Sequence, residues 1–272
     1  ALSLLGFLMM TQFSFGQKIK LKVHDAKDTT VFLVKYTGSK MYYADTAEMK
    51  KSVVEFDGSK HVPGMYALLL PGQKFFEFLI NNEEIHIETV GPNYAENIKV
   101  VRSEENRRFK DYSTYLNTQR KRQMDLSAQR EKLTKDSPEF NAVTKELENL
   151  NTTTVAYQKK FVADNKSFLV GQMIDLTIDI DIPEAPTTVK EEEKAYWRYA
   201  YYRDHYFDKF DFNNNGLVNT PIFGNRMETF FSNKMLVQHW DTILYYAYNV
   251  IDRMDPKSKA WEFTVQYVTS TF

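Results

Sequence analysis

The sequence contains no cysteine among its 272 residues. Disulfide bonds, thiolate metal sites and cysteine nucleophiles are therefore excluded for these residues. Glycine is scarce as well, with ten residues, and we find no glycine-rich phosphate loop, dinucleotide-binding fingerprint or Gly-x-Ser-x-Gly turn. These absences exclude the classes of enzyme that can be recognised from a short sequence motif. We predict that this chain is not an enzyme.

An excess of charge of one sign is also lacking. The 35 basic and 36 acidic residues leave a formal net charge of −1. A chain so close to neutral has no overall field that would steer it to nucleic acid, so we expect no nucleic-acid partner. The basic residues between Arg107 and Lys132 fit a solvated helix face, because Glu131, Glu146 and Glu148 balance them.

Long hydrophobic runs are missing too. The apolar stretch at residues 1–10 is too short to cross a bilayer as a helix, but it matches the core of a signal peptide. Ser14, Phe15 and Gly16 then supply a small-x-small cleavage pattern. We predict a partial signal peptide over residues 1–16 and an exported, periplasmic or cell-envelope protein without a membrane span in the mature chain. The alternative interpretation of this stretch is a buried N-terminal strand or helix.

Residues 18–102 show the period of two that is typical of strands half buried in a sheet. Turn signals rich in glycine, proline and asparagine separate eight such segments, with no helical pattern between them. We therefore expect an antiparallel β-sandwich or barrel in this region. The side chains expected in its core include Leu21, Phe32, Val34, Phe56, Tyr66, Leu68, Phe76, Phe78 and Ile87.

The pattern changes to helical spacing at Ser103, a good helix N-cap that two acidic residues follow. The first helix is expected to end near Leu133, and Ser137 and Pro138 begin the next. Apolar residues at three- and four-residue spacing continue to Phe161. The pattern predicts a long antiparallel helical hairpin over residues 103–164.

Aromatic-rich helices are expected over residues 190–272. Thr220, Asp241 and Asp255 mark the starts of three helices, and no stop signal precedes Phe272, so we expect the chain to be truncated at its C-terminus. The fold class predicted is α+β by segregated domains: a partial signal peptide at 1–16, a β-sandwich domain at 18–102 and an all-α helical domain at 103–272.

The candidate site lies in this helical domain, in a segment where nine aromatic residues crowd between Tyr196 and Phe212. Exposed together, so many rings would form a larger apolar patch than a monomer tolerates. They are either the core of the helical domain or a contact surface, and the sequence leaves both interpretations open. The candidate residues are Tyr196, Trp197, Tyr199, Tyr202, His205, Tyr206, Phe207 and Phe210.

No metal or cofactor is predicted. Asp211 to Gly216 resembles the first half of a calcium-binding EF-hand loop, but the position that needs a bidentate acid is Ile222. The five histidines include no pair with the spacing of a zinc-binding helix. For His205, beside Asp204, we favour a structural histidine paired with a carboxylate.

Several longer phrases resemble a known family. The segments KDTTVFLVKY, PGMYALLLPGQKFFEFLI and SEEN are similar to the N-terminal module of exported thiol–disulfide interchange proteins of Gram-negative bacteria. These proteins end in a TlpA/ResA-like thioredoxin domain. The segments YRDHYFDKFDF and LVNTPIFGNRMETFF resemble a domain of unknown function that follows the module, so the resemblance covers about residues 18–272. The family's Cys-x-x-Cys motif lies on the thioredoxin domain, and no catalytic residue is carried over to this chain.

The resemblance implies a non-catalytic accessory region of an exported thioredoxin-like oxidoreductase. Its partners would be protein clients or the protein's own C-terminal thioredoxin-like domain. An alternative function is a stand-alone periplasmic or surface protein that binds a glycan or peptide through exposed tyrosine and tryptophan rings.

Overall fold

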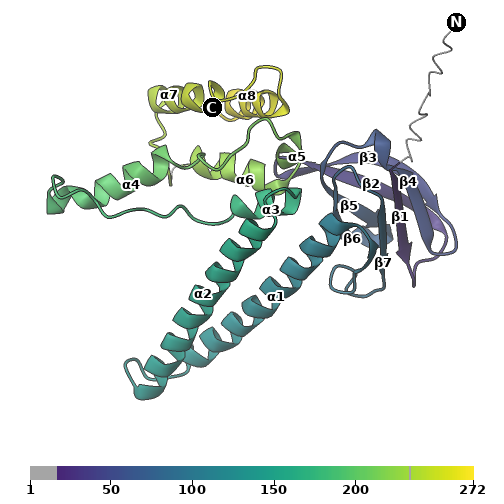
Figure 1. Ribbon diagram of the computed structural model, residues 1–272, viewed down its shortest axis with the longest axis horizontal. Helices are drawn as coiled ribbons and strands as arrows, with labels where there is room; N and C mark the ends of the chain where they lie inside the picture. The colour runs from purple at the N-terminus through teal and green to yellow at the C-terminus, as the bar shows by residue number, and fades with distance from the viewer. Residues whose placement is uncertain (1–16, 233) are drawn as a thin grey trace, which may run out of the picture.

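The computed structural model describes residues 17–232 and 234–272, so the predicted signal segment lies outside the described residues. Two four-stranded sheets come first in the chain and helices follow (Figure 1), which confirms the predicted fold class. The strands are β1 (Lys18–Val23), β2 (Thr29–Thr37), β3 (Lys40–Met49), β4 (Val53–Asp57), β5 (Gly64–Leu70), β6 (Lys74–Ile80), β7 (Ile85–Thr89) and β8 (Lys99–Arg102). The helices are α1 (Glu104–Glu131), α2 (Pro138–Asp164), α3 (Leu169–Asp175), α4 (Lys194–Asp204), α5 (Asn215–Val218), α6 (Pro221–Phe230), α7 (Trp240–Ile251) and α8 (Lys259–Thr271).

One sheet of the sandwich is mixed, although the sequence predicted antiparallel strands throughout. Its order is β4-β1-β7-β8, and β1 runs parallel to β7 with Ile19 opposite Ile85. The second sheet, β3-β2-β5-β6, is antiparallel. The period-two pattern located all eight strands but carries no information on which strands pair, and the parallel pair was missed for that reason.

Two residues that the sequence predicted in the sandwich core, Phe32 and Val34, lie outside it. Val31 and Leu33 take the inward positions of β2. Phe32 is therefore only half buried and packs against the ring of Tyr43 on the outer face, 5.2 Å between centroids. Val34 is buried, but it alternates to that same outer face. The side chains that fill the space between the sheets are Ile19, Leu21, Val23, Val31, Leu33, Met49, Val54, Phe56, Tyr66, Leu68, Leu70, Phe76, Phe78, Ile80, Ile85 and Ile87.

The outer face of the β3-β2-β5-β6 sheet is covered in part by the helices. Tyr36, Met65 and Leu79 leave the sandwich core and join the hydrophobic cluster of the helical region. Strand β5 is consequently buried on both faces, apart from a partly exposed Leu69. Because the sheet and the helices share these buried side chains, the two regions pack as one continuous body.

A buried polar junction attaches α1 to the sandwich. The side-chain amide of Asn106, 2% exposed, accepts a hydrogen bond from the backbone N–H of Leu79 at 2.7 Å and donates one to the Leu79 carbonyl at 2.8 Å. Ser103 caps the helix as predicted, accepting from the Asn106 backbone N–H. The carboxylate of Glu83 accepts from the backbone N–H groups of Glu104 and Glu105, which places a negative charge at the helix N-terminus.

The same junction reaches α3. Glu105 is buried, and its carboxylate accepts from the backbone N–H of Val170 at 2.5 Å and from the amide of Asn81 at 2.8 Å. One turn further along α1, the guanidinium of Arg108 donates to Asn165 at 2.7 Å and lies 3.9 Å from the ring centre of Phe168. Buried charges are tolerated only with such complete hydrogen bonding, so the junction fixes where α1 and α3 lie.

Beyond the junction, α1 and α2 form the predicted hairpin and project away from the rest of the molecule (Figure 1). Tyr157 joins the helices near their base, where its ring stacks on Tyr115 at 3.7 Å and lies 6.3 Å from Tyr112. Farther out, Leu126 and Val143 are the buried side chains of the seam. The distal half of the hairpin therefore has a thin core.

The helix predicted through the aromatic segment is too long. Helix α4 ends at Asp204, and the stretch from Tyr206 to Phe212 is not helical. His239 and Ser258, instead of Asp241 and Asp255, occupy the N-cap positions of α7 and α8, and Ser258 accepts from the backbone N–H of Trp261. The spacing of the aromatic residues was typical of a helix. The rings after the end of α4 are nevertheless placed by their burial in the core and not by a helical repeat.

A second joint brings the β2–β3 turn against α6. The backbone N–H of Met65 donates to the Asn219 carbonyl at 2.8 Å, close to the start of α6. A Cβ on Gly224 would lie 2.3 Å from the backbone nitrogen of Ser39. No side chain fits in this space, so glycine is required for the contact between helix and turn.

We expect Asn106→Ala to lower the free energy of unfolding by about 3 kcal/mol, because it leaves the buried N–H and C=O of Leu79 without partners. Urea denaturation of the variant and the parent measures the loss. Asn149→Ala, at an exposed position of α2, is the matched control and should change stability little. Equal stability of the two variants would contradict the role assigned to the junction.

Gly224→Ala should cost at least about 2 kcal/mol of unfolding free energy, since the methyl group overlaps the backbone of the β2–β3 turn. Asn225→Ala, exposed on the next residue of α6, controls for the change in helix propensity. Thermal unfolding of both variants separates the two effects. A melting temperature for Gly224→Ala at or above that of the control would disprove the close contact.

Candidate interaction site

The eight candidate residues divide into a buried group and a surface group. Tyr206, Phe207 and Phe210 are at most 8% exposed. The ring of Phe207 lies 4.7 Å from Phe230, and Phe210 lies 5.9 Å from Phe223, both on α6. These three residues belong to the core of the helical region.

The other tyrosines and the tryptophan lie on α4, where no residue is fully buried. Tyr196 is 67% exposed, and Trp197 and Tyr202 are partly covered. The hydroxyl of Tyr199 donates to the Met235 carbonyl at 2.5 Å, which ties α4 to the segment that leads into α7. One part of the aromatic segment is therefore core and the other part lies at the surface.

The side chain of His205 pairs with a carboxylate. Its Nδ1 lies 2.5 Å from a carboxylate oxygen of Asp208, and its ring lies 4.1 Å from the ring of Tyr201. The carboxylate partner is Asp208, not the adjacent Asp204. This pairing closes the end of α4 and places no free imidazole in a cavity.

A cavity of about 320 Å³ lies where α4, α6 and α7 meet. Two guanidinium groups, one carboxylate, two tyrosines and an asparagine supply its polar groups, and the buried rings of Phe207 and Phe230 also line it. Its lining residues are Arg203, Asp204, Phe207, Phe230, Tyr245, Tyr246, Asn249, Val250 and Arg253.

Arg203 is held rigidly in this cavity. Its side chain is 15% exposed, and its Nε donates to the Asp204 carboxylate at 2.8 Å. The guanidinium carbon lies 5.4 Å from the ring centre of Tyr199 and 5.1 Å from that of Tyr246. The hydrogen bond to Asp204 raises the pKa of Arg203, so the group is a permanent cation. Burial also raises the pKa of the Tyr246 hydroxyl, which stays protonated.

Arg253 provides the second cation. It donates to the Phe207 carbonyl at 3.0 Å and lies 3.6 Å from the Asp208 carboxylate. Each arginine thus has an acidic neighbour, and the cavity presents donors, acceptors and ring faces without an excess of one charge. Among the described residues, no group of three histidine, aspartate or glutamate side chains could hold a metal ion.

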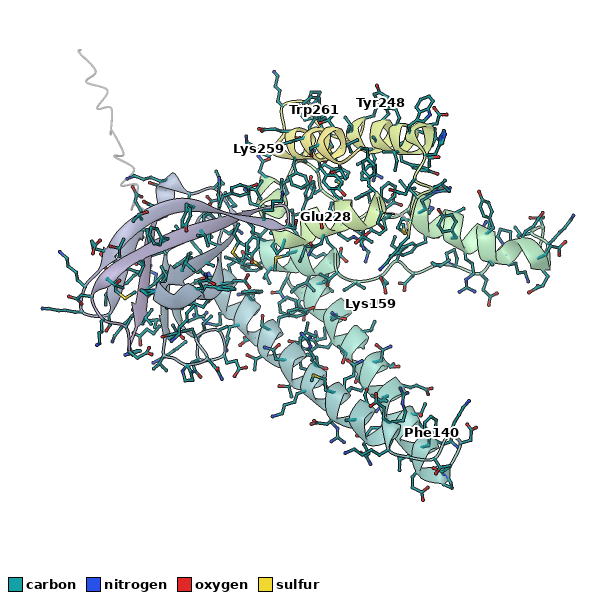
Figure 2. The ribbon with its side chains drawn as sticks, turned by 180° about the vertical axis from the view of Figure 1, so that it is seen from behind. Phe140, Lys159, Glu228, Tyr248, Lys259 and Trp261 are labelled. Atoms are coloured by element: carbon teal, nitrogen blue, oxygen red, sulfur yellow. The ribbon has the colours of Figure 1, made fainter. Side chains whose placement is uncertain are left out.

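The exposed face of α7 lies beside this cavity, and sequence reasoning missed it. Trp240, Leu244, Tyr245 and Tyr248 are between 46% and 70% exposed. Figure 2 places Tyr248 on the outer side of the α7–α8 layer. Only Ile243, Ala247 and Val250 of α7 are buried. The sequence of α7 did contain a signal for this face, because apolar residues lie on nearly all sides of the helix. Such a helix has more apolar surface than contact with one core can bury.

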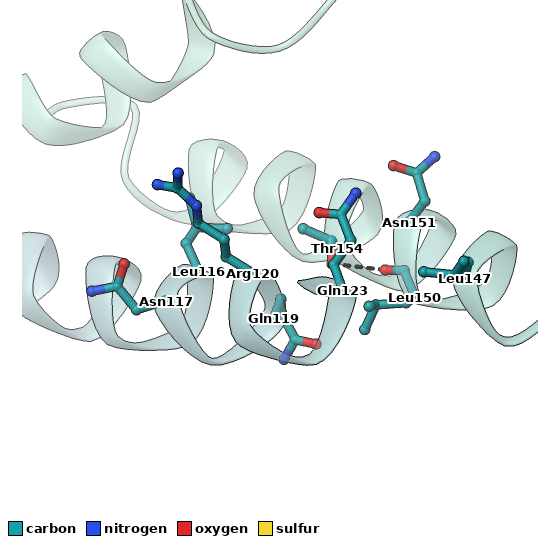
Figure 3. A pocket seen from close by; sticks show the side chains of 9 residues that line it. All are labelled: Leu116, Asn117, Gln119, Arg120, Gln123, Leu147, Leu150, Asn151 and Thr154. Carbon is teal, nitrogen blue, oxygen red and sulfur yellow. Dashed lines mark hydrogen bonds between the residues drawn. The ribbon is translucent and has the colours of Figure 1, made fainter. Parts of the chain in front are cut away.

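A separate groove runs between α1 and α2 in the hairpin. It encloses about 370 Å³, and Figure 3 shows leucines and amide side chains along both helices. Thr154 donates its hydroxyl to the Leu150 carbonyl at 2.7 Å and offers no free donor. Arg120 is the only ionisable group in its lining. With one charge and no aromatic ring, this groove has fewer groups suited to recognition than the α4–α7 cavity.

The loop that resembled half of an EF-hand uses its side chains for local capping. Asp211 accepts from the backbone N–H of Asn213 at 3.0 Å. Asn214 accepts from the N–H of Gly216 at 2.9 Å, and its amide donates to Gln172 at 2.5 Å. These bonds account for the asparagines as turn and helix-start residues.

The described helices include none that is both long enough and apolar enough to cross a membrane. Comparison with known proteins gave one match. No curated protein and no solved structure matches the chain. Residues 17–109 match the family DUF4369, a domain of unknown function. The match covers the whole sandwich and the junction at Ser103 to Asn106, and it ends in the second turn of α1. The chain therefore begins its described part with a DUF4369 domain, and the α4–α7 cavity lies outside that domain.

Proposed function

We propose that this chain is a non-catalytic, exported accessory region that recognises protein segments through the surface of α4 and α7. This recognition surface consists of Tyr196, Arg203, Trp240, Leu244, Tyr245, Tyr248 and Arg253. The observation that carries the proposal is the row of exposed apolar side chains on α7 beside a cavity with two anchored guanidinium groups.

The composition of the surface supports protein recognition. Tryptophan, tyrosine and arginine are the residues most enriched among interface hot spots, and few such residues carry most of a binding energy. Arg203 is already immobilised by Asp204 and two rings, so little side-chain entropy is lost when a partner binds it. The surface is thus organised before its partner arrives.

The aliphatic members favour a protein over a glycan. Leu244 is 46% exposed and the neighbouring Val237 is 71% exposed. A ring face stacks on either a sugar or a peptide, but an exposed leucine or valine gains most by burial against apolar side chains. Unfolded or extended segments of client proteins offer such side chains.

The resemblance to thiol–disulfide interchange proteins gives this recognition a purpose. A chain without cysteine cannot itself exchange disulfides. In the proposed arrangement it holds a client protein or positions a thioredoxin-like domain, and that second domain performs the redox chemistry.

We expect the chain to bind reduced, carboxymethylated α-lactalbumin, a permanently unfolded protein, with saturable heat in isothermal titration calorimetry. The double variant Leu244→Ser/Tyr248→Ser should bind at least about tenfold more weakly, a loss of about 1.4 kcal/mol. Tyr43→Ser is the matched control, because Tyr43 is 70% exposed but lies on β3 of the sandwich. Its affinity should equal that of the parent.

Equal affinities for the double variant and the parent would refute this surface as the contact. A panel of oligosaccharides provides the second arm of the test. Saturable binding of an oligosaccharide, without binding of the unfolded protein, would replace the proposal with the glycan-binding alternative. Circular dichroism of each variant verifies that the exposed substitutions leave the fold intact.

A further inference from the structure

A second cavity lies between the sandwich and α1, next to the polar junction, and Asn106 is one of its lining residues. It encloses about 230 Å³ and has walls from β6, β7, β8, the loop before β8 and α1. Its lining includes the charged residues Glu77, Glu96 and Lys110 and the apolar residues Ile87, Ile98, Val100 and Phe109. None of them belongs to the recognition surface, and the proposed function does not use them.

The middle of this cavity is apolar. Ile87 is 1% exposed and forms part of the sandwich core. Ile98 and Val100 pack on that core, and Phe109 packs on the helical core. These side chains are only partly buried, so an aliphatic group placed against them would remove further apolar surface from water.

Lys110 places an ammonium group in the cavity wall. The group donates to the backbone carbonyl of Glu96 at 2.5 Å, which uses one of its three N–H donors. The part of the chain that the structure describes gives it no carboxylate at ion-pair distance. Burial lowers the pKa of Lys110 more than the nearby Glu96 and Asp111 raise it, so this ammonium is partly removed from water.

Glu77 supplies a carboxylate from β6, a different wall. The hydroxyl of Tyr36 donates to one of its oxygens. Burial, with the bond to Glu77, raises the pKa of Tyr36, so the hydroxyl remains a donor. Within the described ranges no cation pairs with Glu77, and its second oxygen is left with capacity to accept.

We propose that this cavity binds a small zwitterion with an aliphatic body, the class that includes the aliphatic amino acids. The ligand carboxylate would accept from Lys110, the ligand ammonium would donate to Glu77, and the aliphatic part would lie against Ile98, Val100 and Phe109. A ligand with only one charge would leave the opposite wall with an unpaired ion, which is costly in a partly buried site.

The volume also limits the ligand. The cavity is below the roughly 300–1,000 Å³ range of sites for drug-sized molecules. A single amino acid or a short aminoalkanoic acid matches this size, and a folded polypeptide segment does not.

Isothermal titration calorimetry of the whole chain tests the proposal with four probes. L-Leucine and 6-aminohexanoate carry both charges at different spacings, whereas 4-methylpentanoate lacks the ammonium and isopentylamine lacks the carboxylate. We expect at least one zwitterion to bind, and each singly charged compound to bind at least about tenfold more weakly than it. No saturable heat from either zwitterion, or equal affinity for a singly charged compound, would overturn the assignment.

Substitutions locate the ligand. Lys110→Met and Glu77→Gln should each weaken binding of the zwitterion at least about tenfold, because each removes one charge while keeping side-chain length. The glutamine still accepts a hydrogen bond from Tyr36. Lys121→Met, exposed on α1 and outside the cavity, is the matched control and should bind as the parent does. Unchanged affinity in Lys110→Met would refute the site.

Methyl NMR of the unsubstituted chain gives a test that does not depend on variant stability. Leucine addition should shift the methyl resonances of Ile98 and Val100 and leave unchanged those of Leu244 on the recognition surface and of Val237 beside it. The reverse pattern would move the ligand to the recognition surface and end the proposal. The two sites consist of different residues. If leucine does not bind the cavity, the proposed recognition of proteins by α4 and α7 can therefore still be tested separately.

Discussion

The side-chain amide of Asn106 pairs with both backbone groups of one residue of β6, an edge strand of its sheet. A helix is thereby attached to a sheet by hydrogen bonds that neither element could form within itself. The direction of α1 follows from this attachment, and the buried carboxylate of Glu105 carries the constraint to α3. The hairpin, the zwitterion cavity and the base of the helical region all depend on where α1 begins. The DUF4369 match extends through Asn106, so the domain includes its own attachment point for the helix.

Much of the architecture could be predicted from local sequence alone. Alternation along β1 and the cap at Ser103 are signals carried by adjacent residues, and both were interpreted correctly. Interactions between distant residues were not accessible in this way. Nothing near Glu83 indicates that its carboxylate caps a helix twenty residues later, and nothing in β1 shows that its neighbour is β7. The prediction that Phe32 lies in the sandwich core was wrong for a related reason. Val31 and Leu33 occupy the inward face of β2, so Phe32 points to the other face.

The candidate site was predictable only in part, because aromatic residues serve equally well in cores and at contacts. The segment around Tyr206 contains both buried rings and surface rings, with the division near the end of α4. The second half of the recognition surface comes from α7, about forty residues later, and proximity of Tyr245 to Arg203 is a consequence of packing. The zwitterion cavity is still less visible in sequence. Glu77 and Lys110 belong to a strand and a helix, and each is unremarkable on its own.

The parallel pairing of β1 with β7 affects how the chain acquires its structure. Strand β1 is central in its sheet, and its parallel neighbour β7 lies more than sixty residues later in the sequence. All four strands of the second sheet lie between them in the chain. Closing so long a loop is slow, because chain entropy is lost before the contact contributes. During synthesis on a ribosome, β2, β3, β5 and β6 emerge in time to pair with their sequence neighbours, whereas β1 gains its second neighbour only when β7 appears. The hairpin of α1 and α2 depends on contacts between residues close in sequence, so we expect it to form rapidly once both helices have been synthesised. We therefore expect assembly of the sandwich to be slower than formation of the helices, even though more residues lie in helices than in strands.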